Sequence, residues 1–255
     1  MGAVGVEFAK VSYALSADTP GQPRRTLLRD ISLRLEAGTT TALLGRSGSG
    51  KTTLLRMVNG LVTPTSGQVQ VGGKPTADYE AVALRRGIGY VIQETGLFPH
   101  MTVERNAGMA LELAKRSGLE ISTRAEEVLK LVGMDFGEFR KRYPWQLSGG
   151  QRQRVGLARA LAMDPDVLLM DEPFGALDPL TRSEMQTMLR GLLQRVRKTV
   201  LLVTHDLDEA LYLAERVVFL AEGAIVADLP AGEVLRSENH HVKDYVLAVH
   251  RAVVA

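Results

Sequence analysis

The stretch that most restricts what this chain can fold into is LLGRSGSGKTTLL, residues 43–55. Three glycines, two serines and a lysine separate two apolar runs, and two threonines follow the lysine. A glycine-rich loop is costly in entropy to order, so a ligand is expected to compensate. Residues Gly45–Thr52 match G-x-x-x-x-G-K-[ST] in full, with an apolar strand predicted before and a helix after. This context predicts a loop whose backbone amides bind phosphate.

Each polar residue of the loop has a chemical role in that prediction. Lys51 can reach the outer phosphates as a point charge, and Thr52 offers a hydroxyl to Mg²⁺. The amides from Gly48 to Thr52 and the N-terminus of the following helix add partial positive charge. The alternative is a glycine-rich loop with no ligand, and the flanking strand and helix disfavour it.

Composition excludes several other classes of function. The formal net charge of +2 is too small to indicate nucleic acid as a main partner. The chain has no cysteine, which excludes disulfides, thiolate metal sites and cysteine nucleophiles. Apolar runs such as Val200–Val203 are far shorter than the roughly 18 residues of a membrane span. The N-terminus has no basic region followed by an apolar core, so we expect no secretory signal and a cytosolic globular protein.

The apolar pattern predicts an α/β core interrupted by a mostly helical insert. Val167–Met170 and Val200–Thr204 are continuous apolar runs, typical of central parallel strands. Further strands are predicted at Glu7–Tyr13, Ile31–Leu35, Thr40–Leu44, Ser66–Gly73 and Ile88–Gln93, and a hairpin at Val217–Leu220 and Ala224–Asp228 around Glu222-Gly223. Helices are predicted at Thr53–Gly60, Val103–Lys115, Thr123–Val132 and Val155–Met163, and two short ones in the last 25 or so residues. Ser16–Arg25, with two prolines and a glycine, is predicted to be a surface loop.

Polar residues follow several of the predicted strands. Asp171 and Glu172 come after an apolar strand, where ligands of open parallel sheets bind. Asp171 is therefore predicted to hold Mg²⁺ through water, and Glu172 to orient and deprotonate an attacking water. The alternative is an acidic turn that caps the next element, and the lysine loop makes that alternative less attractive.

Two further strand ends carry weaker signals. His205 can donate a hydrogen bond to a γ-phosphate, and the amide of Gln93 can contact Mg²⁺ or the water. A lone histidine or glutamine is usually structural. The agreement of four strand ends on one nucleotide favours a functional role for both.

The pentapeptide Leu147-Ser148-Gly149-Gly150-Gln151 precedes an amphipathic helix. Its glycines and serine predict a second anion-binding helix start, and the alternative is a plain cap by Ser148. The chain then has two phosphate cradles and one lysine loop. A head-to-tail dimer, in which the second cradle of one copy closes over the nucleotide of the other, accounts for both.

These motifs in this order resemble the ATP-binding subunit of ABC transporters, over about residues 5 to 230. The resemblance implies a P-loop NTPase (RecA-like) α/β core with an antiparallel β subdomain and an inserted α-helical subdomain, and ATP and Mg²⁺ as cofactors. We expect the core at 1–93 and 163–229, the helical subdomain at 94–162 and a short helical tail at 230–255. The residues that the resemblance places on the phosphates are Gly45, Arg46, Ser47, Gly48, Ser49, Gly50, Lys51, Thr52 and Thr53.

The resemblance also implies the remaining roles. Thr52, Gln93 and Asp171 serve the Mg²⁺ shell, Glu172 is the general base and His205 the switch histidine. Ser148, Gly149, Gly150 and Gln151 contact ATP across the dimer, with Asp178 in the loop that joins the two active sites. Tyr13 occupies the place of an aromatic ring that stacks on adenine; the alternative is an ordinary strand-end tyrosine.

Residues 95–102 (TGLFPHMT) follow Gln93 and are expected to expose Phe98 and Met101 to a coupling helix of the membrane permease. The alternative is local packing within the insert. The expected partners are a second ATP-binding subunit, giving a homodimer, the permease and indirectly a solute-binding protein, but no nucleic acid. This places the chain peripherally at the cytoplasmic face of the inner membrane.

Residues 93–106 and 142–182 resemble uptake systems for osmoprotectants such as glycine betaine, choline and carnitine. Many of those continue into a C-terminal regulatory region, whereas this sequence ends at Ala255, so we expect no such regulation. The alternatives are an importer of another small solute, an exporter subunit, or an ABC ATPase that acts on ribosomes or DNA.

Overall fold

The computed structural model describes residues 3–15 and 25–249, so the predicted loop Ser16–Arg25 falls, except for Arg25, outside the described residues. The chain forms two compact units. Residues 3–84 and 199–249 form one, called here the split unit, and residues 85–198 form the other, the continuous unit. The predicted domain boundaries at residues 93, 162 and 229 stay predictions.

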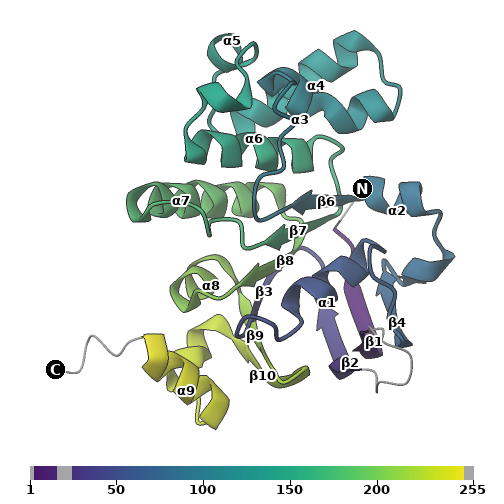
Figure 1. Ribbon diagram of the computed structural model, residues 1–255, viewed down its shortest axis with the longest axis vertical. Coiled ribbons are helices and arrows are strands. Elements are labelled where there is room, and N and C mark those ends of the chain that lie inside the picture. The colour runs from purple at the N-terminus through teal and green to yellow at the C-terminus, as the bar shows by residue number, and fades with distance from the viewer. Residues whose placement is uncertain (1–2, 16–24, 250–255) are drawn as a thin grey trace. The chain divides into compact units, whose positions relative to one another are not determined.

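The split unit contains an antiparallel sheet in the order β2-β1-β4-β5, of which Figure 1 labels β2, β1 and β4. Its strands are β1 (Val6–Ala14), β2 (Thr26–Leu35), β4 (Ser66–Val71) and β5 (Lys74–Pro75). Val6 pairs with both Leu35 and Val71 across β1. Buried and outward residues alternate along much of β1 and β2, as the sequence pattern predicted for a half-covered sheet.

The split unit also contains parallel strands that lead to the lysine loop. Every residue of β3 (Thr40–Leu44) and of β8 (Thr199–Thr204) is buried, which explains why both read as continuous apolar runs. Strand β3 lies between β8 and β9 (Arg216–Ala221) and is parallel to both. Strand β3 therefore has a parallel neighbour on each side within this unit, and the lysine loop follows its last residue.

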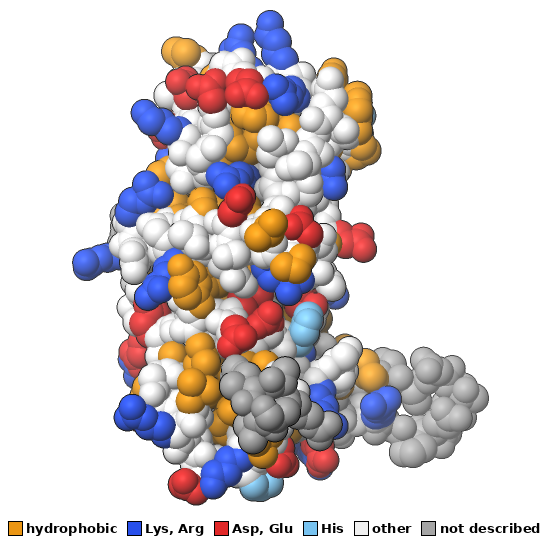
Figure 2. Space-filling view, turned by 90° about the vertical axis from the view of Figure 1, so that its left-hand side faces the viewer, with side chains coloured by type: hydrophobic (Ala, Val, Ile, Leu, Met, Phe, Trp, Pro, Cys, Tyr) orange, Lys and Arg blue, Asp and Glu red, His pale blue; other side chains and the backbone are white. Residues whose placement is uncertain are grey.

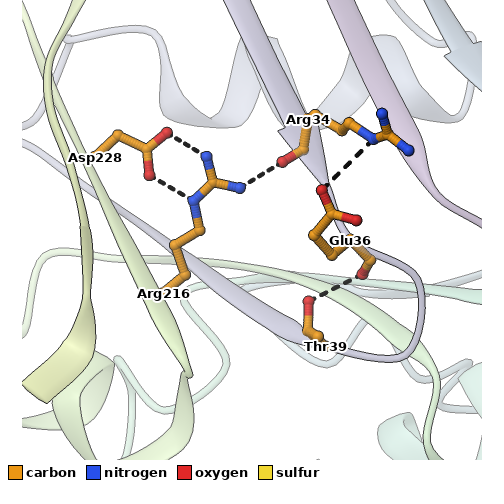
Figure 3. Close-up of polar contacts among 5 residues, drawn as sticks. All are labelled: Arg34, Glu36, Thr39, Arg216 and Asp228. Carbon is orange, nitrogen blue, oxygen red and sulfur yellow. Dashed lines mark hydrogen bonds and ion pairs between the residues drawn. The ribbon is translucent and has the colours of Figure 1, made fainter.

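Strands β9 and β10 (Ala224–Pro230) form the predicted hairpin around Glu222 and Gly223. Arg216 on β9 binds Asp228 on β10 through two side-chain hydrogen bonds, and it also donates to the Arg34 carbonyl at 2.7 Å (Figure 3). The hydrogen bonds that Arg216 donates to Asp228 raise the pKa of the Arg216 guanidinium. Arg216 therefore joins the hairpin to the end of β2.

The helices of the split unit flank these strands. They are α1 (Lys51–Val58), η1 (Thr76–Asp78), α8 (Leu207–Leu213), η3 (Ala231–Arg236) and α9 (His240–Val249), and α2 (Ala81–Arg86) spans the boundary between the units. Residues of β3, α8, β9, η3 and α9 share one hydrophobic cluster. This cluster supports the strand that ends at the lysine loop.

The continuous unit combines the parallel pair β6–β7 with several helices. Its elements are β6 (Ile88–Val91), α3 (Val103–Leu113), α4 (Gly118–Leu131), α5 (Phe136–Phe139), η2 (Pro144–Gln146), α6 (Gly149–Leu161), β7 (Val167–Asp171) and α7 (Pro179–Val196). Helices α3, α4 and α6 pack on one another. Leu129, Val155 and Ala158 are completely buried within this unit.

Several predicted bounds were wrong. Strand β6 ends at Val91, so Gln93 lies in the loop beyond it. Helix α1 begins at Lys51 instead of Thr53, and α4 begins at Gly118 because Ser117 and Glu120 form a capping box there. Each of these ends is set by a local hydrogen bond or turn and not by the apolar pattern.

Among the described residues, the helices α2, α5, α7 and α8 were missed. The signal for α7 was present: Asp178 caps a helix with Pro179 at its first position, and the buried residues Met185, Leu189, Leu192 and Leu193 recur at helical spacing. Helix α8 is capped by Asp206, whose side chain accepts a hydrogen bond from the Glu209 amide. For α7 and α8, the residues at the helix start therefore predict the helix better than the overall polarity of the segment does.

Candidate functional site

The lysine loop lies in the split unit between β3 and α1. Gly50 is the N-cap residue of α1, and its φ of 102° is a backbone conformation that residues with a side chain rarely adopt. A Cβ atom at Gly45 would lie 2.3 Å from the Leu220 carbonyl oxygen, so only glycine allows this approach to β9. Two glycines of the motif are thus required by backbone conformation and by packing.

The lysine of this loop is held in place by the loop itself. Lys51 is only 6% exposed, and its Nζ donates to the carbonyls of Gly45 at 2.7 Å and Arg46 at 3.1 Å. These contacts fold the ammonium back over the loop between β3 and α1. A ligand phosphate can exchange for these two neutral acceptors, because an anion is the stronger partner for an ammonium.

The loop also contains a polar atom that suits a ligand. Ser49 Oγ is buried and has no hydrogen-bond partner among the described residues. The start of α1 supplies backbone amides, and the side chains of Lys51 and Thr52 supply a cation and a hydroxyl. This donor set fits a nucleotide phosphate with Mg²⁺.

Tyr13 and His205 lie in the same unit as the lysine loop. Tyr13 is half-buried on β1 opposite Leu28 of β2. His205 follows β8 directly and is exposed, and its backbone carbonyl accepts a hydrogen bond from Tyr245 Oη at 2.6 Å. The next residue, Asp206, is the N-cap residue of α8.

Asp171 and Glu172 lie in the continuous unit at the end of β7, which is parallel to β6. Asp171 is 5% exposed, and Tyr90 Oη of β6 donates to its Oδ2 at 3.3 Å. Gln93 Nε2 donates to Glu172 Oε2, also at 3.3 Å. The structure therefore brings together three predicted residues, Gln93, Asp171 and Glu172, in this unit.

Glu172 has an unusual backbone. Its φ is 46°, in the left-handed region, which costs a non-glycine residue about 1 kcal/mol. Such strain is concentrated at functional sites, where the surrounding structure maintains it. Gln153 of α6 contributes to that support, because its side chain donates to the carbonyl of Pro173.

The Leu147–Gln151 turn is a capping box at the start of α6. Ser148 Oγ accepts from the Gln151 amide at 3.2 Å, and Gln151 Oε1 accepts from the Ser148 amide at 2.9 Å. The Ser148 cap, which the sequence offered as the alternative, is present, and the anion-binding role of the turn stays a prediction. The cap leaves the backbone amides of Gly149 and Gly150 in the first turn of the helix, where an anion can bind.

The turn at residues 147–151 packs against residues 177–181, around the start of α7. A Cβ atom at Gly149 would meet Leu177 Cδ2 at 3.4 Å, and one at Gly150 would meet Thr181 Cγ2 at 2.7 Å. Asp178 caps α7 by accepting from the Thr181 amide at 3.1 Å. Hydrogen bonds from Thr181 lower the pKa of the Asp178 carboxyl. Residues 148–151 and 177–181 are therefore one packed surface.

The loop after Gln93 is bound to α6. Arg159 donates to the carbonyls of Gly96 and Thr95, each at 2.7 Å. Burial lowers the pKa of the Arg159 guanidinium. Thr95 also lies against α6 at Gly156, where an added Cβ would be in ordinary van der Waals contact with the Thr95 carbonyl oxygen at 3.6 Å.

The remainder of this loop is organised by Asn106 of α3, which is completely buried. Its side chain accepts from the Phe98 amide at 2.8 Å and donates to the carbonyls of Phe98, Met101 and Thr102 at 3.0–3.1 Å. Phe98 is 38% exposed as expected, whereas Met101 is half-buried. Sequence reasoning missed Asn106, Tyr90, Gln153 and Arg159; a polar residue inside an apolar helix face was the available signal for Asn106.

The lysine loop after a buried parallel strand, and the acidic pair after another strand, define an α/β protein of the P-loop class. A model of the ABC transporter family matches residues 28–175. The chain is 44% identical over 227 residues to the osmoprotectant import ATP-binding protein OsmV of Salmonella typhimurium, covering 89% of this chain and 59% of OsmV. It is 46% identical over 241 residues to the sulfate/thiosulfate import ATP-binding protein CysA of Nocardia farcinica, covering 88% of this chain and 71% of CysA. The chain therefore belongs to the ABC transporter family.

A solved structure shows the same fold. The ATP-binding cassette MJ0796, solved as a dimer in a post-hydrolysis state with ADP and Pi, matches with a TM-score of 0.77 and 34% identity. The match covers 89% of this chain and 98% of that one. The predicted fold class, a P-loop α/β core with an antiparallel sheet and a helical subdomain, is confirmed.

The helices and the surface of the described residues can be compared with what a membrane protein requires. None of the helices in residues 3–15 and 25–249 has both the length and the hydropathy that crossing a bilayer requires. On the face drawn in Figure 2, basic and acidic side chains are interspersed, with small groups of apolar side chains between them.

Proposed function

We propose that this chain is the ATP-hydrolysing subunit of an ABC importer. The observation that carries the proposal is the loop from Gly45 to Thr52, with its buried lysine, between strand β3 and helix α1. The family match and the nucleotide-bound state of MJ0796 support it.

The phosphates are held by the loop residues Gly45, Arg46, Ser47, Gly48, Ser49, Gly50, Lys51, Thr52 and Thr53, and Tyr13 stacks on adenine. Thr52, Gln93 and Asp171 hold Mg²⁺, which neutralises charge on the phosphates. The buried serine hydroxyl and the amides at the start of α1 fit this role.

Glu172 accepts the proton of the attacking water, and Gln93 orients Glu172 through their hydrogen bond. His205 donates a hydrogen bond to the γ-phosphate and stabilises the charge that develops there. The strained backbone of Glu172 supports its assignment as the base.

Two copies act together. Ser148, Gly149, Gly150 and Gln151 of one copy contact the nucleotide bound by the other, and Asp178 lies in the loop that joins the two sites. The packing of Gly149 and Gly150 on residues 177–181 supports this, as does the dimeric state of MJ0796.

The remaining partners are membrane components. The loop 95–102, ordered by Arg159 and Asn106, presents Phe98 to a helix of a permease and transmits the nucleotide state from Gln93. This places the chain peripherally at the cytoplasmic face of the inner membrane, with a solute-binding protein as an indirect partner.

The solute that best fits is a quaternary amine osmoprotectant. Residues 93–106 and 142–182 resemble that group, and OsmV is named an osmoprotectant import protein. A second candidate is another small solute, which the 46% identity to the sulfate/thiosulfate protein CysA favours. Uptake of labelled glycine betaine and of labelled sulfate, in cells with and without Lys51→Ala, distinguishes the two.

The central experiment compares Glu172→Gln with Glu184→Gln, an exposed glutamate on α7 of the same unit. Glu172→Gln is expected to retain Mg-ATP binding, trap a dimer and lower turnover by at least about 100-fold. Glu184→Gln is expected to behave as wild type. Unchanged turnover in Glu172→Gln contradicts the assignment of the base, and a strictly monomeric ATP-bound variant contradicts the dimer.

A further inference from the structure

The C-terminal helix α9 contacts the backbone of the proposed switch histidine. Tyr245 Oη donates a hydrogen bond of 2.6 Å to the carbonyl of His205. Both residues belong to the split unit, although 40 positions separate them in the sequence. This bond holds the peptide that carries the histidine, just beyond the end of β8.

Helix α9 is anchored at its start, so the tyrosine is not on a loose tail. Asn239 Oδ1 accepts from the His241 amide at 2.9 Å, which caps the helix. Asn239 Nδ2 donates to the Val226 carbonyl of β10 at 2.8 Å. The first turn of α9 is therefore tied to the β9–β10 hairpin.

Packing fixes the tyrosine ring as well. Val242 of α9 is completely buried in the cluster that contains Leu207 of α8 and Phe219 of β9. The Tyr245 ring meets the Phe219 ring edge to face, with centroids 5.7 Å apart and an interplanar angle of 78°. The hydroxyl reaches His205 from a ring that is held by its neighbours, which makes it a directional contact.

We propose that Tyr245 is a positioning residue for His205, and that α9 thereby sets the activity of the catalytic site. The inference rests on the proposed function. The His205 side chain is exposed, and its direction depends on the backbone between β8 and α8. Asp206 caps α8, and its backbone amide donates to Thr204 Oγ1 at 3.0 Å. Tyr245 binds the other polar group of the same peptide, the His205 carbonyl. Without the phenol, the peptide keeps its place at the end of β8 but loses the restraint that Tyr245 supplies.

The test is Tyr245→Phe in the 255-residue chain, with Tyr79→Phe as the matched control. Tyr79 also donates a phenol hydrogen bond to a backbone carbonyl in the split unit, that of Val71 at 2.9 Å. We expect Tyr245→Phe to lower kcat for ATP by about 3- to 10-fold, with KM within about twofold of wild type. Tyr79→Phe is expected to leave kcat unchanged. An equal loss of kcat in both variants, or none in Tyr245→Phe, overturns the proposal.

Two further measurements separate positioning from general weakening. Tyr245→Phe should accelerate hydrogen exchange in residues 203–208 selectively, and the double variant with His205→Ala should be no slower in turnover than His205→Ala alone. Additive losses, or exchange equal to wild type, overturn the inference. If the wild-type chain hydrolyses no ATP, the proposed function fails, while hydrogen exchange still reports whether Tyr245 restrains the peptide.

Discussion

Gln93 Nε2 donates a hydrogen bond of 3.3 Å to Glu172 Oε2 and so joins residues 79 positions apart in the sequence. One residue follows β6 and the other follows β7, and these two strands are parallel neighbours. The contact links the proposed base to the start of the loop that Arg159 and Asn106 hold in place through hydrogen bonds to its carbonyls. We therefore expect a change in the position of the base to be transmitted to the loop 95–102.

Replacing Gln93 by Ala should lower kcat for ATP by about 10-fold, because the carboxylate of Glu172 loses the group that orients it. Binding of ADP without Mg²⁺, which does not involve the proposed metal role of Gln93, should change less than threefold. The control is Gln194→Ala, which removes an exposed glutamine from α7 of the same unit. Equal kcat in the two variants contradicts a role for this hydrogen bond.

Replacing Tyr90 by Phe removes the hydrogen bond to Asp171 and leaves the ring. The carboxylate is then less well oriented, and the Mg²⁺ concentration for half-maximal ATPase activity should rise by about 3- to 10-fold. A titration of activity against Mg²⁺ at saturating ATP checks this. Tyr79→Phe serves again as control, and the prediction fails if both curves coincide with wild type.

Gly150→Ala should lower the free energy of unfolding by about 1–3 kcal/mol, since its Cβ would lie 2.7 Å from Thr181 Cγ2. Adding Thr181→Ser removes that methyl group and should restore most of the loss. Gly191→Ala in α7, where nothing lies within 4 Å of the new atom, should be neutral or stabilising. Denaturant unfolding of the four proteins measures this, and no rescue by Thr181→Ser would refute the packing argument.

Arg159→Met should free the loop after Gln93, because two carbonyls lose their donor. We expect a loss of about 1–3 kcal/mol in unfolding free energy and faster hydrogen exchange in residues 92–101. Arg154→Met is the matched control, since Arg154 lies on the same helix and donates to the Val132 carbonyl at 2.9 Å instead. Equal exchange of residues 92–101 in both variants contradicts the prediction.

The Asp164–Lys198 pair should make stability depend on pH. The hydrogen bond from Lys198, with N and O 2.8 Å apart, lowers the pKa of the Asp164 carboxyl below its unfolded value of about 3.9. Its contribution is thus present above about pH 4 and is lost as pH falls through the folded pKa. The Asp164 side chain is 71% exposed, so the contribution is only about 0.2–1 kcal/mol.

Asp164→Asn isolates this charge, because asparagine accepts the left-handed backbone of this position, where φ is 50°. The variant should be less stable than wild type at pH 6, and the difference should disappear as pH falls through the folded pKa of Asp164. Unfolding in urea at several pH values measures it. A difference that stays constant with pH contradicts an electrostatic origin.

Local patterns in the sequence predicted the buried strands, the hairpin at Glu222-Gly223 and the lysine loop correctly. They also predicted that Gln93, Asp171 and Glu172 lie together, because the ends of neighbouring parallel strands meet at one edge. The predicted end of β6 and the predicted start of α4 were wrong, because a single cap or turn decides where such elements begin and end. Helix α7 was missed although its cap and its apolar spacing were visible.

The sequence by itself determined the groups that carry chemistry, because a phosphate loop or an acidic strand end is made of residues adjacent in the chain. Only the tertiary structure decided which side chains hold those groups in position. Tyr245 contacts His205, and Arg159 contacts Thr95, through hydrogen bonds between residues 40 and 64 positions apart. Such contacts depend on how helices α9 and α6 pack on their neighbours, and packing of distant segments leaves no periodic signal in the local sequence.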